Sequence, residues 1–380
     1  MAPIRVGLIG LNTNVYDGGN IRAGTWGVVH LTSISKSPHY KLVALCNSTA
    51  EKARKSIEHH KLDPATKAYG SVDELARDPD VDLIVVCVHV DKHYALAKTA
   101  LENKKSVFSE FPLSNSYPEV EELVELAKQG GVKTIVGAQA RGDLALRKVK
   151  NLVDSKAIGD VVSSSWVAHL PRSTWDGLPE AVKFFLDLEG GPSRINVGLG
   201  HSLEPFTHVL GEFKDIQTVF KTHGKTTRLF DDTGNVVDPA YKVTAPEYIL
   251  IQGVLNSGAV ASITLRCTSD SADEAGHRWI ISGTEGELQF TIPAGNFIQI
   301  QGHLSEAKVL LKRWKGETEE VDFKRNEPAH VSSVTGDVIN TARLYESFAT
   351  GDEDGYPSFE SARKVHHLID RMKKVAVWAP

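Results

Sequence analysis

The N-terminal run PIRVGLIGLNTNVYDGGNIRAGTWGVVHLTSISK, residues 3 to 36, constrains the fold more than any other stretch. Residues 4 to 9 are apolar enough for a strand buried on both faces, and Gly7 and Gly10 frame the turn that ends it. Glycine lets the backbone approach a pyrophosphate, and the N–H groups of the following helix point at the anion. The run therefore predicts a strand, a glycine turn and a helix that bind a nucleotide.

The glycine motif is weaker than usual because no third glycine follows at the usual spacing and the insertion NTNVYDGGNIRA comes first. Gly24 and Gly27 are the two candidates for that third position. An ordinary glycine turn between a buried strand and a helix remains an alternative at this point.

Composition indicates an intracellular globular protein of two or three domains, with 380 residues, 41% of them apolar and 24% charged. We see no membrane span and no signal peptide, and we expect a cytoplasmic protein. Cys46, Cys87 and Cys267 lie far apart and are expected as buried thiols. A net charge of -5 without a basic run argues against a nucleic-acid surface.

A second buried strand over residues 41 to 47 ends without the acidic residue that usually binds the adenosine ribose. Amide, hydroxyl and cationic groups that would suit a 2′-phosphate follow instead, and they predict NADP as the cofactor, with NAD possible. The alternative is a solvated helix start with a serine or threonine N-cap. The residues concerned are Asn47, Ser48, Thr49, Lys52 and Arg54.

Strands and helices then alternate along the chain, with strands expected at 82–88, 106–110 and 133–139 and helices at 93–103 and 117–129. This alternation predicts an α/β, Rossmann-type, doubly wound parallel sheet. Its ligands are expected outside the carboxyl ends of the strands.

The second half has period-two alternation instead, which predicts an α+β domain with an open, mostly antiparallel sheet. Alternate residues from Ala259 to Cys267 share one face, as do Leu288, Phe290 and Ile292. A last helix near 359–373 presents Ala362, Val365, Ile369 and Met372 on one stripe. We expect a nucleotide domain over 1–145, with 355–375 packing back on it, and a substrate and oligomerisation domain over 146–354.

Short motifs spread over most of the chain resemble the glucose-fructose oxidoreductase, inositol dehydrogenase and MocA (Gfo/Idh/MocA) family. They are VGLIG (6–10), HYALAKTALENKKSV (93–107), SEFPLS (109–114), GAQAR (137–141), IGDV (158–161), GGP (190–192), GH (200–201) and GTEGEL (283–288). The resemblance implies a nicotinamide at the mouth between the two domains and a homodimer or homotetramer formed through the second sheet. The cofactor residues that it implies are Gly7, Gly10, Asn12, Trp26, His89, His93, Glu110, Phe111 and Gln139.

Within this family the sequence resembles the fungal galactose-pathway repressors, which keep the fold and bind a nicotinamide cofactor without being enzymes. The shared details are GLN at 10–12, Trp26 before His30, HVDKHY at 89–94 and GLGHS at 198–202. This similarity implies a protein partner if the chain is a regulator.

Two departures from the family pattern bear on catalysis. The family's Glu-Lys-Pro turn reads Glu110, Phe111, Pro112 here, so the lysine is absent. In the second motif His201 stands at the histidine position, but Val197 replaces the aspartate. We therefore expect His201 to handle the proton and Glu110 to orient the turn under the nicotinamide.

Aromatic and polar residues gather at 166–184, where the resemblance places a substrate loop; an exposed irregular loop is the alternative. The predicted substrate residues are Trp166, His169, Arg172, Lys183, Asn196 and His201, with Trp175 in the same loop. Four further histidines, His59, His60, His366 and His367, are expected in solvent. No cluster has metal-ligand spacing, so no metal is predicted.

The leading function prediction is an NAD(P)-dependent oxidoreductase acting on a small organic substrate with an activated C=N, C=C or C=O bond. A cofactor-binding transcriptional regulator without activity is the first alternative. A non-redox acid/base enzyme on the same scaffold is the second. No membrane or direct nucleic-acid partner is expected.

Overall fold

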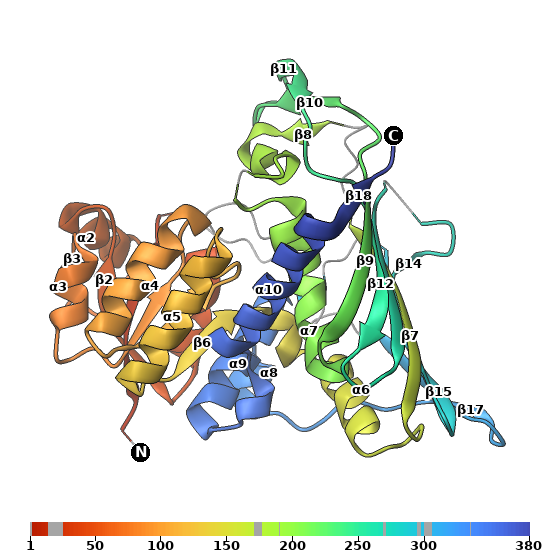
Figure 1. Ribbon diagram of the computed structural model, residues 1–380. Helices are drawn as coiled ribbons and strands as arrows, with labels where there is room; N and C mark the ends of the chain where they lie inside the picture. Colours follow the sequence, from red (N-terminus) through yellow and green to blue (C-terminus); the bar gives the residue numbers. More distant parts are fainter. Residues whose placement is uncertain are drawn as a thin grey trace. The chain divides into compact units, whose positions relative to one another are not determined.

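The computed structural model describes residues 2–13, 26–170, 177–189, 191–268, 271–294, 298–299, 306–334 and 336–380. The chain divides into two compact units, each formed by two separate segments. The first unit comprises Met1–Gly142 and Asn326–Arg363, and the second comprises Asp143–Arg325 and Lys364–Pro380 (Figure 1).

The first unit contains a six-stranded sheet with the order β3-β2-β1-β4-β5-β6, and all its strand pairs are parallel. The predicted doubly wound parallel sheet is confirmed. Its strands are β1 (Ile4–Ile9), β2 (Tyr40–Cys46), β3 (Lys67–Tyr69), β4 (Leu83–Val86), β5 (Ser106–Glu110) and β6 (Thr134–Gly137).

Helices connect these strands in the alternation that the sequence predicts. They are α1 (Trp26–Lys36), α2 (Ala50–His59), α3 (Val72–Arg77), α4 (His93–Glu102) and α5 (Tyr117–Gly130), with short 3-10 turns η1 (Val90–Lys92) and η2 (Gln139–Gly142).

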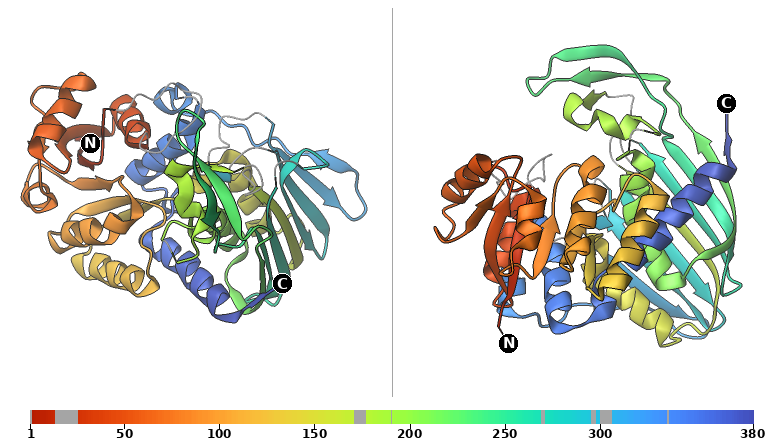
Figure 2. Two further views of the ribbon diagram at one scale, coloured as in Figure 1. Left: turned by 90° about the horizontal axis from the view of Figure 1, so that it is seen from above. Right: turned by 60° about the vertical axis from the view of Figure 1, so that its left-hand side comes forward.

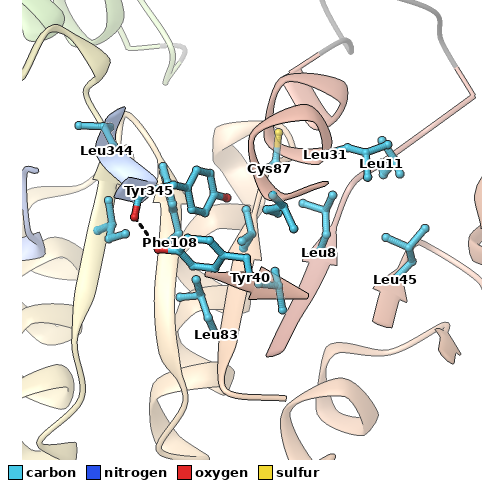
Figure 3. Packing of buried hydrophobic residues seen from close by; sticks show 14 of the residues in the cluster. Leu8, Leu11, Leu31, Tyr40, Leu45, Leu83, Cys87, Phe108, Leu344 and Tyr345 are labelled. Carbon is cyan, nitrogen blue, oxygen red and sulfur yellow. Dashed lines mark hydrogen bonds between the residues drawn. The ribbon is translucent and has the colours of Figure 1, made fainter. Parts of the chain in front are cut away.

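One large apolar cluster joins the sheet to α1, α2 and a helix from the distant second segment, α9 (Ile339–Thr350). Figure 3 shows Leu8, Leu45 and Phe108 from the strands facing Leu31 of α1 and Leu344 of α9. The hydroxyl of Tyr40 donates a hydrogen bond to the Tyr345 carbonyl at 2.7 Å, the dashed line in Figure 3. Burial of this apolar area supplies most of the stability of such a core.

The return of residues 326–363 to the first unit corrects the predicted domain boundary, which placed residues up to 354 in the second domain. Val334, Val338 and Ala342 bury against Val29 of α1. Arg343 and Glu327 form a bidentate ion pair at 2.9 and 2.8 Å with both side chains buried. The segment also contains α8 (Ala329–Ser332), η6 (Gly336–Val338) and η7 (Glu353–Gly355).

The last helix, α10 (Phe359–Val375), begins in the first unit and ends in the second. Its predicted stripe of Ala362, Val365, Ile369 and Met372 is buried, as expected. His366 lies on the same buried side at 6% exposure, so its predicted exposure to solvent is wrong. It falls one position after Val365, within the broad apolar face that a core helix presents.

The second unit is built on a nine-stranded mixed sheet with the order β17-β16-β15-β14-β7-β13-β12-β9-β18. Antiparallel pairs dominate it, while β13 pairs β7 and β18 pairs β9 in parallel. The strands are β7 (Val161–Leu170), β9 (Phe213–Lys221), β12 (Tyr248–Leu255), β13 (Val260–Cys267), β14 (Ala275–Gly283), β15 (Gly286–Pro293), β16 (Lys308–Arg313), β17 (Thr318–Glu320) and β18 (Ala376–Trp378).

One face of this sheet is covered by α6 (Leu144–Asp154) and α7 (Gly200–Leu210), which both lie beside it in Figures 1 and 2. The predicted period-two faces are confirmed, because Ile263 and Leu265 of β13 and Phe290 of β15 are buried. A smaller three-stranded sheet has the order β11-β10-β8. Its elements are β8 (Leu178–Pro179), β10 (Thr226–Phe230) and β11 (Val236–Lys242), beside η3 (Glu180–Leu186) and η4 (Arg194–Leu199).

The other face of the large sheet carries exposed apolar side chains. Val377, Val219 and Leu250 stand in one row across β18, β9 and β12, at 65%, 37% and 44% exposure. Assembly into a homodimer or homotetramer through this sheet stays a prediction. Sedimentation velocity of the purified protein measures the oligomeric state that tests it. Among the described residues, none of the helices is long and apolar enough to cross a membrane.

Candidate functional site

The turn after β1 admits only glycine at position 10. Gly10 has a φ of +100°, and a Cβ built there lies 2.0 Å from the Cys87 carbonyl oxygen. Its N–H donates to the Cys46 carbonyl at 3.1 Å, so the turn is fixed between β2 and β4. Glycine here lets the chain turn tightly against the end of β4, as the first turn of a dinucleotide-binding unit requires.

The first turn of α1 packs directly on this turn through Gly27. A Cβ at Gly27 would lie 3.0 Å from Leu11 Cα and 3.2 Å from the Gly10 carbonyl oxygen. Gly27 thus takes the third glycine position, where close packing of helix on strand is required. Gly24 lies outside the described residues, whereas Trp26 packs half-buried against the apolar core.

The side chains that follow β2 form hydrogen bonds within the protein that the sequence did not predict. Asn47 Nδ2 donates to the Leu11 carbonyl at 2.8 Å and to Ser56 Oγ at 3.2 Å. Thr49 is the N-cap of α2, and its side chain accepts a hydrogen bond from the backbone N–H of Lys52 at 3.1 Å. This N-cap is the one that the alternative interpretation of the sequence expected. Thr49 therefore has a structural role that does not require a ligand.

Cationic groups remain at this edge of the sheet. Lys52 Nζ contacts Ser48 Oγ at 3.1 Å, and Arg54 is exposed on the same helix. The Asn12 carbonyl accepts from His60 Nε2 at 2.6 Å, so His60 is partly buried, contrary to its predicted place in solvent. Neutral and basic side chains, among them Asn47, Lys52 and Arg54, thus follow β2.

Glu110 is the last residue of β5, and its carboxylate lies in a network of side-chain hydrogen bonds. Gln139 Nε2 lies 3.2 and 3.1 Å from its two oxygens, and His30 Nε2 lies 2.9 Å from Oε1. His30 Nδ1 shares a second hydrogen bond, with the Tyr345 hydroxyl, at 2.8 Å. The positioning role expected for Glu110 stays a prediction, and this network is compatible with it.

Gly137 leaves the space that the Glu110 carboxylate occupies, since a Cβ there would lie 2.2 Å from Glu110 Oε1. The sequence analysis missed His30, Tyr345 and Gly137 as members of this network. His30 appeared only as part of a motif, and Tyr345 lies more than 230 residues from Glu110, so nothing in their spacing brings them together.

His93 supports the Phe111–Pro112 turn, which has a cis peptide bond. Its Nδ1 lies 2.7 Å from the Pro112 carbonyl oxygen and its Nε2 lies 2.9 Å from that of Val88. Burial lowers the pKa of His93, although these two carbonyl groups act in the opposite direction. With both nitrogens facing backbone oxygens, His93 positions the turn in which Phe111, itself 6% exposed, stands for the family's lysine. His89 is exposed and pairs with Asp91 at 3.0 Å.

In the second unit, the predicted proton-handling residue His201 is the second residue of α7 and is 5% exposed. Asn196 precedes it in η4, where its Nδ2 donates to the Gly191 carbonyl at 2.5 Å. Ser193 caps this segment by accepting from the Asn196 backbone N–H at 3.3 Å. The Asn196 amide therefore holds the GGP loop to the helix that carries His201.

The structure corrects the predicted role of Trp166. This side chain is 1% exposed, stacks on Trp279 at 4.4 Å between ring centroids, and donates from Nε1 to His277 at 3.3 Å. It belongs to the core of the sheet, because strand alternation turns residue 166 to the face covered by α7.

His169 and Lys183, two further predicted substrate residues, make separate contacts. His169 is buried with Nε2 2.6 Å from the Thr268 carbonyl oxygen. Lys183 is exposed and pairs with Glu180 at 3.0 Å. Arg172 and Trp175 lie outside the described residues.

Two family models match successive parts of the chain. Residues 19–138 match the oxidoreductase family with an NAD-binding Rossmann fold, and residues 145–291 match the C-terminal domain of Gal80p. The nucleotide-binding part of the chain thus matches the Gfo/Idh/MocA oxidoreductase family. The resemblance found in the short motifs is thereby confirmed, and the Rossmann domain supports a nicotinamide cofactor.

Similar proteins in the family include both regulators and a dehydrogenase. The chain is 28% identical to the galactose/lactose metabolism regulatory protein GAL80 of Kluyveromyces lactis over 78% of its length, and it spans 65% of that protein. It is 24% identical to dehydrogenase aclE of Aspergillus oryzae over 98% of this chain and 96% of that one. The solved Kluyveromyces lactis Gal80p structure has a TM-score of 0.79 at 25% identity, covering 98% of this chain and 92% of that one.

Proposed function

We propose that this protein is an NADP(H)-dependent oxidoreductase that reduces a small organic molecule with an activated C=N, C=C or C=O bond. The glycine turn supports this most, because Gly10 and Gly27 permit the tight turn and the close packing of helix on strand that a dinucleotide site needs. The similarity to a dehydrogenase over nearly the whole of both chains also favours an enzyme.

The residues of this chain have separate tasks in that reaction. A bound nicotinamide supplies the hydride. His201 gives the proton to the atom of the reduced bond that does not receive the hydride, which is the nitrogen or oxygen of a C=N or C=O bond and the second carbon of a C=C bond. The Glu110 network holds the turn that follows β5. Phe111 cannot carry a proton, so a reaction that needs a strong base is disfavoured and an already activated double bond is the expected substrate class.

Replacing His201 by alanine is expected to lower kcat/KM about 100-fold or more, the usual contribution of a general acid. The measurement is NADPH oxidation with a panel of aldehydes, ketones, imines and enones. His208→Ala is the matched control, because His208 lies on the same helix and is partly exposed. Unchanged turnover in His201→Ala would remove His201 from the mechanism, while an equal loss in both variants would point to damage of α7.

NADPH is expected to bind at least about tenfold more tightly than NADH, because no carboxylate stands at Asn47 and the cation of Arg54 is exposed nearby. Calorimetric titration of both cofactors measures the preference. Arg54→Ala should reduce it, whereas Lys55→Ala on the same helix, whose ammonium pairs with Glu51 at 2.9 Å, should leave it intact. Equal affinities for the two cofactors in the wild type would contradict the proposal.

A cofactor-dependent regulator is the second candidate, favoured by Phe111 at the lysine position and by the match to the Gal80p C-terminal domain. It requires a protein partner that binds the chain only with the nucleotide present. Such binding, together with no turnover on the whole substrate panel, would decide for the regulator. A non-redox acid/base enzyme would instead turn over substrate without consuming NADPH.

A further inference from the structure

Two histidines and one glutamate meet in the first unit, away from the nucleotide turn. His330 Nε2 lies 2.6 Å from Glu346 Oε2, and His39 Nε2 lies 3.6 Å from the same oxygen. One ligand atom from each of the three residues lies within 4.8 Å of the other two. We propose that His39, His330 and Glu346 form a binding site for Zn²⁺.

Two imidazole nitrogens and a carboxylate oxygen suit the chemistry of zinc, which binds such atoms at about 2.0–2.2 Å. Around a tetrahedral ion, ligand atoms stand roughly 3.3 Å apart at those bond lengths. The observed spacings bracket this value, so small side-chain rotations bring all three atoms to one ion. The side chains are 39%, 20% and 19% exposed, which leaves the fourth position to water.

The backbone around each ligand is already held in place. The His39 carbonyl accepts a hydrogen bond from the Ile4 N–H at 2.8 Å. The backbone N–H of His39 donates one to Ser37 Oγ at 3.2 Å. The buried pair of Arg343 with Glu327 fixes the chain just before His330 to the helix that carries Glu346. The site therefore needs little ordering when the ion binds, which favours affinity.

The place of the site in the sheet separates it from the nucleotide. His39 immediately precedes β2, whereas Asn47 immediately follows it, so the two stand at opposite ends of that strand. A zinc ion there would connect the N-terminal end of β2 to α8 and α9. We expect the ion to stabilise the attachment of residues 326–363 to the first unit. We expect it to have no part in hydride transfer.

The test is calorimetric titration of the full chain with Zn²⁺, combined with thermal unfolding. We expect one tight equivalent and a Tm that rises with metal concentration. His330→Gln and Glu346→Gln should each weaken binding at least about tenfold and abolish the rise in Tm. His59→Gln is the matched control for adventitious binding, since the chain has 15 histidines and His59 is exposed in the same unit.

Cobalt provides a second readout that does not depend on stability. Co²⁺ in the wild type should give the intense visible absorption of a four-coordinate site, and His39→Gln should lose it. Absence of a tight equivalent in the wild type overturns the proposal. Binding that persists unchanged in both His330→Gln and Glu346→Gln overturns it as well.

Discussion

Gly10→Ala is expected to destabilise the first unit by at least about 3 kcal/mol and to abolish nucleotide binding. The new methyl group would stand 2.0 Å from the Cys87 carbonyl oxygen and 2.8 Å from Val88 Cγ1. The carbonyl cannot retreat, because the Cys87 N–H is bonded to Ile9 within the same sheet at 3.1 Å. Hydrogen exchange of the peptides covering β1 and β4, with NADPH titration, measures both effects.

Gly131→Ala is the matched control for the left-handed backbone alone. Gly131 has a φ of +62° at the end of α5 in the same unit, and a Cβ there would meet nothing within 4 Å. Its replacement should cost about 1–2 kcal/mol and leave nucleotide affinity unchanged. Similar losses in the two variants would mean that the contact with Cys87 does not govern the turn.

Acid is expected to destabilise the second unit well before its carboxylates titrate. Burial lowers the pKa of His277 to about 3, with His169 acting in the same direction, and lowers that of His366 to about 3, with Lys373 adding to the effect. The unfolded chain binds these protons near pH 6.5. Stability is therefore complete above that pH and falls as the pH drops toward 3.

Each histidine contributes a slope of about 1.4 kcal/mol per pH unit in that window, so the two together cost about 4 kcal/mol at pH 5. Urea unfolding at pH 7.5 and pH 5, followed by tryptophan fluorescence, measures the loss. His366→Gln should remove about half of it, whereas His367→Gln, at the partly exposed neighbouring position, should retain it. An undiminished loss in His366→Gln would contradict the buried, neutral state of this histidine.

Local patterns predicted β1, β2, β4, β5 and β6 of the first sheet, and β13 and β15 of the second, because each pattern reflects burial. The strand expected at 106–110 is β5, and the face from Ala259 to Cys267 is buried in β13. A strand buried on both faces is apolar throughout, and a strand covered on one face alternates, so the two sheets differ in the sequence itself.

Side-chain roles could be predicted only where a motif supplied them. Trp166 looked like a pocket wall, yet the strand that carries it turns it toward Trp279, and only the strand pairing shows this. His30, Glu110 and Tyr345 come from three distant parts of the chain and are brought together by tertiary packing. The same holds for His39, His330 and Glu346, whose separation in sequence conceals their meeting.

The return of residues 326–363 to the first unit also bears on how this protein is made. As the ribosome releases the chain, β1 to β6 emerge long before α9, which supplies Leu344, Tyr345 and Phe348 to their core. Until then the apolar surface beneath α9 stays open to solvent, while the whole second sheet except β18 is being synthesised. The first domain to emerge is thus among the last to be completed, and in this interval it offers chaperones a surface that the finished protein hides.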